Sequence, residues 1–163
     1  MKGWLAVAAA AMGSLAAGAA PAQSIALGGL AGEKVTLAAA DIAALPHQPV
    51  TLQLEGKSEA CDGVPLSLIL AKVGAPQGKA LRGLELADVV VVGAADGYRV
   101  ALALAETDPL MRGDQVFLAD RCGGGALAPP EGPFRLVVLG DKRPARSARQ
   151  VTSITLLRLP AGP

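Results

Sequence analysis

The spacing of apolar side chains predicts a domain built mainly from short strands. Residues 50–54 alternate apolar and polar side chains with period two, as a strand with one buried face requires. Residues 98–104 alternate in the same way, and the valine run at 88–93 is rich in β-branched residues. Because residues 95–97 (ADG) supply turn chemistry between these two segments, we expect them to pair as a hairpin.

The remaining pattern adds further strands and two short helices. More strands are expected at residues 34–37, 116–119, 134–139 and 151–159. Apolar residues with helical spacing predict a helix at 66–73, which Gly74 ends, and a second helix is expected at 38–45, ahead of Pro46.

Two stretches carry no clear pattern. Residues 23–32 are interpreted as a flexible start and residues 55–62, which are mostly polar, as a loop. Since strands and helices follow no regular βαβ alternation, the pattern predicts an α+β fold, a single mixed, β-rich domain with two or three short helices.

The amino-terminal segment has the features of a secretory signal peptide. Lys2 is followed by an alanine-rich apolar run, and small residues at Ala20 and Ala22 precede Gln23. A permanent membrane anchor fits poorly, because glycine and serine interrupt the run. We therefore expect a signal peptide at 1–22, a mature domain at 23–163, no stable membrane span after cleavage, and a periplasmic or secreted location.

Composition narrows the range of partners. Cleavage removes one of 15 basic residues and leaves them equal to the 14 acidic ones, so the mature chain has no net field that would attract nucleic acid. Aromatic residues make up 2% of the chain, too few for platforms on which bases stack.

The chain has two cysteines, Cys61 and Cys122. In an oxidising compartment such a pair is expected to form a disulfide, here joining the loop before the 66–73 helix to the turn after strand 116–119. No CxxC motif is present and His47 is the only histidine, so no metal site is predicted from these residues.

An ordered series of motifs runs through the mature chain. They are DIAALP at 41–46 leading into 50–54, CDGVPL at 61–66, DGY at 96–98, LAE at 104–106, and EGPFRLVV at 131–138 running on to GDKR at 140–143 and RQV at 149–151. Together, over about residues 33–158, they resemble small exported members of the oxidoreductase molybdopterin-binding (sulfite-oxidase-like) family. The resemblance implies that family's β-rich molybdopterin-binding fold.

The same resemblance argues against the family's cofactor. In the molybdopterin-using relatives a cysteine thiolate binds molybdenum just after the strand equivalent to 50–54, where this chain has Leu54 and Glu55. The amino terminus also lacks the arginine pair of proteins that are exported folded with a cofactor. We expect no cofactor and no metal. The alternative is a molybdopterin-dependent oxidoreductase in which Cys61 replaces the missing ligand.

One basic cluster suggests a ligand. Lys142, Arg143, Arg146 and Arg149 lie within eight residues, and guanidinium groups bind oxyanions bidentately. The family places its pterin-phosphate contacts in the corresponding segment. This cluster is predicted to bind a small anion or an acidic protein partner, and the alternative is a solvated loop that keeps the sheet edge soluble.

No catalytic residue is identified from the sequence. His47 has no recognisable nucleophile beside it, Ser147 has no base, and the glycines at 123–125 are interpreted as a turn. The leading hypothesis is an exported, cofactor-free binding domain, favoured over an enzyme, with a sulfite-oxidase-like molybdopterin-dependent oxidoreductase as the enzymatic alternative. An accessory subunit of an envelope redox system is a further alternative.

Overall fold

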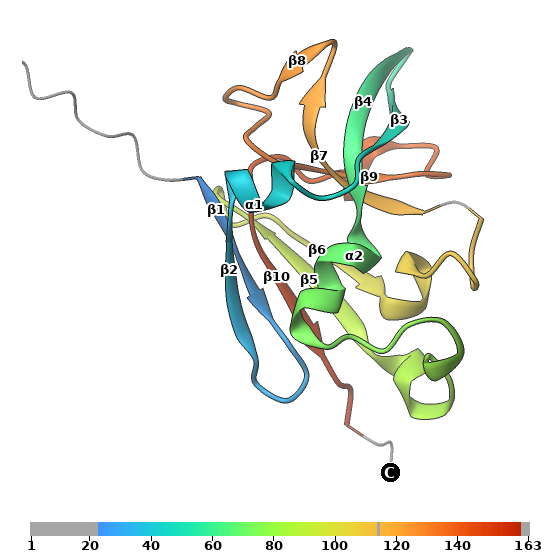
Figure 1. Ribbon diagram of the computed structural model, residues 1–163. Helices are drawn as coiled ribbons and strands as arrows, with labels where there is room; N and C mark the ends of the chain where they lie inside the picture. Colours follow the sequence, from blue (N-terminus) through green and yellow to red (C-terminus); the bar gives the residue numbers. More distant parts are fainter. Residues whose placement is uncertain (1–22, 114, 161–163) are drawn as a thin grey trace, which may run out of the picture.

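The computed structural model describes residues 23–113 and 115–160, and the predicted signal peptide lies outside this part of the chain. The ten strands described form two five-stranded sheets (Figure 1). The first sheet has the order β2-β1-β10-β5-β6, with β1 at Ser24–Gly28, β2 at Lys34–Ala38, β5 at Val89–Ala94, β6 at Arg99–Ala103 and β10 at Val151–Leu157. The second has β3 at Gln48–Leu54, β4 at Lys57–Pro65, β7 at Val116–Cys122 and β8 at Gly125–Ala126 in that order, with β9 at Arg135–Val138 also paired to β7.

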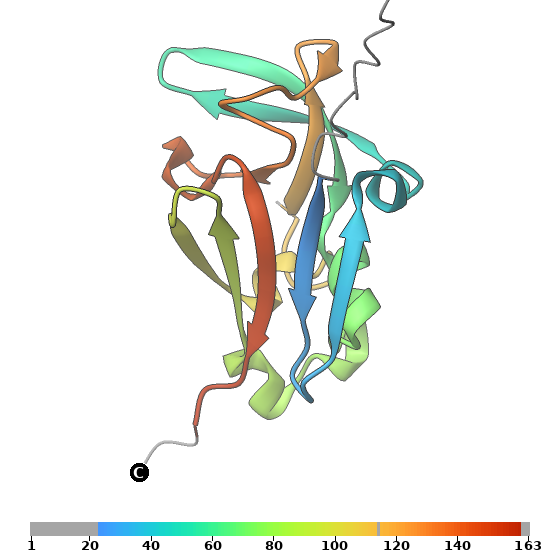
Figure 2. The same ribbon diagram turned by 90° about the vertical axis from the view of Figure 1, so that its left-hand side faces the viewer.

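The first sheet corrects one expectation from the sequence. The segment predicted as a flexible start contains β1, which pairs antiparallel with β2 and parallel with β10 (Figure 2). Ile25 and Leu27 point into the core and are almost fully buried. The strand has only five residues, and its partner β10 comes from the other end of the chain. The sequence of residues 24–28 alone is therefore too short to predict it.

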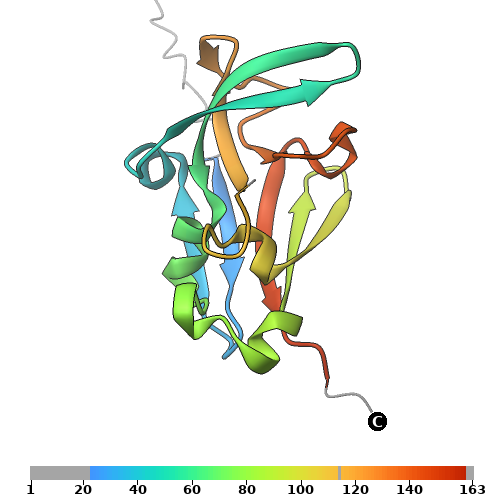
Figure 3. The ribbon, with the colours of Figure 1, turned by 90° about the vertical axis from the view of Figure 1, so that its right-hand side faces the viewer.

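The second sheet corrects a second expectation from the sequence. Residues predicted as a loop at 55–62 form the first part of β4, which pairs antiparallel with β3 across a turn at Gly56. The polar residues at the start of β4 are mostly solvent-exposed, because this hairpin projects beyond the rest of the sheet (Figure 3). Polarity here reflects an exposed strand rather than a loop.

The helices are short, as predicted. Helix α1 spans Ala39–Ala43, and the Asp41 carboxylate accepts a hydrogen bond from the Ala38 N–H at 2.8 Å. Helix α2 spans Leu66–Leu70 and continues as a 3₁₀ turn to Gly74, whose φ of 70° ends it. No helix within the described residues is long and apolar enough to cross a membrane.

The core is aliphatic. Strands of both sheets and α2 enclose one large cluster in which Phe134 is the only aromatic side chain. A smaller cluster under the β3–β4 hairpin contains Val50, Leu52, Phe117 and Cys61. The architecture confirms the predicted fold class, a single strand-rich α+β domain with few short helices.

Cys61 and Cys122 are bonded, with their sulfur atoms 2.02 Å apart. They lie opposite each other on β4 and β7, not in a loop and a turn as expected, because both strands extend further than the apolar pattern suggested. The disulfide therefore joins two neighbouring strands at the base of the projecting hairpin.

Candidate functional site

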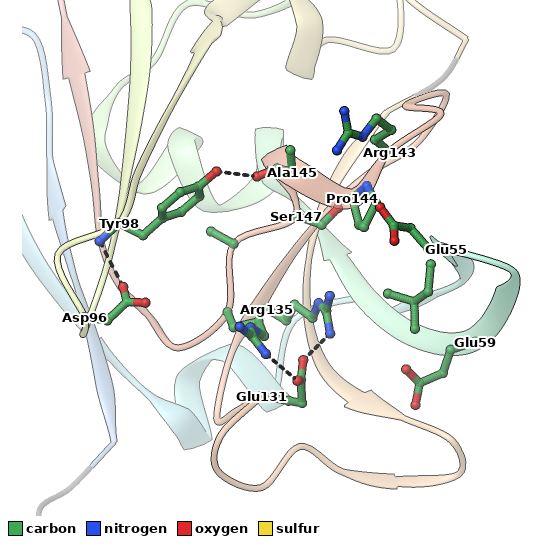
Figure 4. Close-up of a pocket in the computed structure, with 13 residues that line it drawn as sticks. Glu55, Glu59, Asp96, Tyr98, Glu131, Arg135, Arg143, Pro144, Ala145 and Ser147 are labelled. Atoms are coloured by element: carbon green, nitrogen blue, oxygen red, sulfur yellow. Dashed lines mark hydrogen bonds and ion pairs between the residues drawn. The ribbon is translucent and has the colours of Figure 1, made fainter.

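A cavity of about 650 Å³ opens where the projecting hairpin meets the turn of the first sheet (Figure 4). Four segments line it: the tip of the β3–β4 hairpin, the β5–β6 turn, the start of β9 with the residues before it, and the loop at 143–149. Volumes of this size are typical of sites for small organic molecules.

Two arginines share one carboxylate on one wall of the cavity. Arg135 Nη1 donates to one oxygen of Glu131, and Arg149 Nη1 donates to the other at 3.0 Å. Arg135 is 7% exposed, and its Nε is buried with no hydrogen-bond partner. Burial lowers the pKa of Arg135, Glu131 opposes this, and Arg149 lowers the pKa further. Glu59 also raises the pKa of Arg135, so the two guanidiniums share one hydrogen-bonded carboxylate and have a second carboxylate nearby.

Close packing and backbone hydrogen bonds fix the main chain around these residues. Gly132 lies against the Leu127 carbonyl, where any Cβ would collide with that oxygen. The Leu136 N–H donates to the Ala148 oxygen at 2.8 Å, and the Val151 N–H donates to the Phe134 oxygen at 2.9 Å. These bonds place Glu131 and Arg135 beside the loop that carries Arg149.

The four residues of the predicted basic cluster lie in different surroundings. Arg143 and Arg149 line the cavity, whereas Lys142 is exposed and does not line it. Arg146 is engaged elsewhere: its Nε and Nη2 donate to Asp141 at 2.9 and 2.6 Å, and its Nη1 donates to Glu106 at 3.0 Å. These contacts raise the pKa of Arg146 and lower that of Asp141. Arg146 therefore stabilises the loop.

Sequence reasoning missed Arg135. It is the one charged residue in the otherwise apolar strand β9, between Phe134 and Leu136. A charge inside a buried strand is rare unless it is paired or has a function, so this pattern was the available signal.

Ser147 and Tyr98 support the loop. Ser147 is buried, and its Oγ accepts a hydrogen bond from the Val138 N–H at 3.3 Å. The Tyr98 hydroxyl donates to the Ala145 carbonyl at 2.8 Å. These bonds assign both side chains to positioning the 143–149 loop against the two sheets.

His47, Glu106 and Asp108 do not line the cavity. His47 Nδ1 is 2.8 Å from the Leu45 carbonyl oxygen, and its Nε2 is 3.2 Å from Asp120 Oδ1. The Asp108 carboxylate accepts the Leu110 N–H at 2.8 Å, and Glu106 pairs with Arg112 and Arg146. Each of these groups contacts neighbouring parts of the fold.

The cavity does not fit the molybdenum centre that the family resemblance would imply. Leu54 lines it, and no cysteine, histidine or methionine is among the lining residues. Cys61 and Cys122 are bonded to each other, so neither offers a thiolate. Glu59 lies within 4.8 Å of both sulfurs, but only a reduced pair would complete a donor set with it. The donor chemistry that molybdenum requires is therefore missing from the wall.

Comparison with known proteins supports the fold. The structure is similar to a chain in the crystal structure of the sulfane dehydrogenase SoxCD from Paracoccus pantotrophus, with a TM-score of 0.64 and 22% sequence identity. The match covers 83% of this chain and 38% of that chain, so this protein spans little more than a third of its neighbour. No family model and no curated protein sequence matches the chain. The likeness therefore establishes a relationship of fold.

Proposed function

We propose that this chain is an exported, cofactor-free domain that binds a small anionic ligand in the cavity beside Arg135 and Arg149. The observation that carries the proposal is the buried Arg135 guanidinium, which shares its only carboxylate with a second arginine. A buried charge is costly unless it is compensated, and an oxyanion in the cavity would accept hydrogen bonds from the guanidinium donors that Glu131 leaves unused.

Arginine chemistry suits this role. Guanidinium groups donate paired hydrogen bonds to carboxylate, sulfate or phosphate oxygens. Arg143 adds a third cation to the lining of the same cavity. This proposal modifies the expectation from the sequence, because Arg135 replaces Arg146 and Lys142 among the residues that would contact the ligand.

Export is supported by two observations that do not depend on the cavity. The first 22 residues have the sequence features of a cleavable signal peptide, and the two cysteines stand at disulfide distance. The absence of a thiol from the cavity wall supports the cofactor-free part of the proposal.

Calorimetric titration of the mature protein with sulfate, phosphate and small carboxylates tests the binding. Replacing Arg149 by glutamine should weaken anion binding about tenfold, the expected loss for a hydrogen bond to a charged group. Lys142→Gln is the matched control, because Lys142 is a neighbouring cation that does not line the cavity. Equal weakening by both variants, or unchanged affinity in Arg149→Gln, would contradict the proposal.

An acidic protein partner is the second candidate for the same arginines. Its side-chain carboxylate would occupy the cavity in place of a free anion. In that case the isolated domain would bind free anions weakly while Arg149→Gln still abolished capture of the partner.

A further inference from the structure

The cavity carries acidic groups as well as arginines. Its lining contains three guanidiniums and four carboxylates, from Arg135, Arg143, Arg149, Glu55, Glu59, Asp96 and Glu131. Glu131 is paired with two of the arginines, and Asp96 accepts the Tyr98 N–H at 2.9 Å. Within residues 23–113 and 115–160, Glu55 and Glu59 form no hydrogen bond or ion pair. The wall therefore offers two carboxylates without a partner beside two arginines that share Glu131.

The two unpaired carboxylates lie on a different side of the cavity from the Arg135–Glu131 pair. Figure 4 shows Glu55 and Glu59 on the side formed by the β3–β4 hairpin, with Glu131 and Arg135 on the opposite side. Glu59 is near enough to Arg135 to raise the pKa of that guanidinium. Any ligand held by Arg135 therefore lies within electrostatic range of at least one free carboxylate.

This arrangement disfavours a simple anion. An oxyanion between Arg135 and Arg149 gains attraction from the guanidiniums but is repelled by the hairpin carboxylates. The cavity, at about 650 Å³, also has the size of a site for an organic molecule rather than a single ion. A ligand that carries an ammonium group opposite its anionic group would meet complementary charge on both walls.

We infer that the ligand is a small zwitterion, with its anionic group on Arg135 and Arg149 and its ammonium group on Glu55 and Glu59. The inference rests on the proposed function, since it assumes that the arginine wall binds an anionic group. It adds the β3–β4 hairpin as the element that selects the ligand. Arg135 is more than nine-tenths buried, and its Nε has no hydrogen-bond partner although its Nη1 is paired with Glu131.

A matched pair of probes tests the inference. 3-Aminopropanesulfonate and propanesulfonate have the same chain length and anionic group, and only the first carries an ammonium group. Titration calorimetry should show tighter binding of 3-aminopropanesulfonate. Glu55→Gln and Glu59→Gln should each weaken it up to about fivefold, the range for an exposed ion pair. The same variants should leave propanesulfonate unchanged or bound more tightly, because they remove repulsion.

Controls separate this inference from the proposed function. Asp62→Asn removes an exposed carboxylate from β4 that does not line the cavity, and it should alter neither affinity. Arg149→Gln should weaken both probes. Equal affinity for the two probes, with no effect of the glutamate variants, would overturn the zwitterion while the anion site stands. Failure of both probes, sulfate, phosphate and carboxylates to bind would overturn the proposed function as well.

Discussion

Arg135 occupies a position where an apolar side chain would pack without electrostatic cost. Its neighbours Phe134, Leu136 and Val137 are all buried. The guanidinium shares its hydrogen-bonded carboxylate with Arg149, and Glu59 lies within electrostatic range. Retaining arginine at such a place gains little stability, because desolvation offsets most of the Coulombic attraction. This cost is the reason to assign the residue to ligand binding rather than to folding.

The Arg135→Met substitution should therefore weaken anion binding without a comparable loss of stability. Glu131 keeps Arg149 as its partner and is partly exposed, so the substitution leaves no uncompensated buried charge. We expect the free energy of unfolding to stay within about 1 kcal/mol of the natural protein, or to rise. Anion affinity should fall at least tenfold. Urea unfolding and calorimetry measure the two quantities, and a large loss of stability with unchanged affinity would assign Arg135 to the fold.

The Asp141–Arg146 pair should make stability depend on pH in the acid range. The hydrogen bond from Arg146 lowers the pKa of Asp141 below its ordinary value of 3.8. The stabilisation is therefore fully present above that value and is lost as pH falls through the lower pKa of the folded state. The stabilities of the natural protein and of Asp141→Asn in urea unfolding should differ most at pH 6, and the difference should shrink as the pH falls below 3.8. A difference that stays unchanged throughout the acid range would contradict this origin.

At the scale of elements, the sequence predicted the strands and helices that have regular apolar spacing or clear turn and stop residues. The β5–β6 hairpin and the α2 segment ending at Gly74 follow from spacing and turn residues. Strand β1 was not predicted because it is only five residues long and one of its two partners, β10, comes from the other end of the chain. The start of β4 was not predicted because an exposed hairpin needs few apolar residues. The cavity is lined both by segments that the sequence predicted and by the start of β4, which it did not. The proximity of residues such as Glu59 and Arg135 is therefore visible only in the structure.

The disulfide between β4 and β7 should be a major contribution to stability. It joins cysteines 61 positions apart, and the chain-entropy estimate for a loop of that length is about 4 kcal/mol. We expect Cys61→Ala/Cys122→Ala to lower the free energy of unfolding by about 2–4 kcal/mol. Chemical denaturation measures the loss, and reductant should destabilise the natural protein but not the double variant. Two free thiols per chain under denaturing, non-reducing conditions would contradict the bond itself.

At the scale of the whole molecule, the fold and the chemistry of the cavity favour different functions. The fold is shared with a dehydrogenase structure more than twice as long, and the motifs from 41 to 151 resemble a molybdopterin-binding family. Leu54 nevertheless lines the cavity, and no cysteine is among the lining residues. Because a fold supports many chemistries, the side chains that line the site are the better guide to function.

Metal analysis decides whether the loss of cofactor is real. The mature domain, made in the cytoplasm of a host that synthesises the cofactor, should contain far less than one molybdenum per chain, because no thiolate lines the cavity. The cytoplasm keeps thiols reduced, so Cys61 would be free to act as the substitute ligand and that alternative is tested too. Leu54→Cys is the matched variant, since it returns a thiol to the wall. Molybdenum in this variant alone would assign the loss to one side chain, whereas near-stoichiometric molybdenum in the natural chain, removed by Cys61→Ser, would establish the oxidoreductase instead.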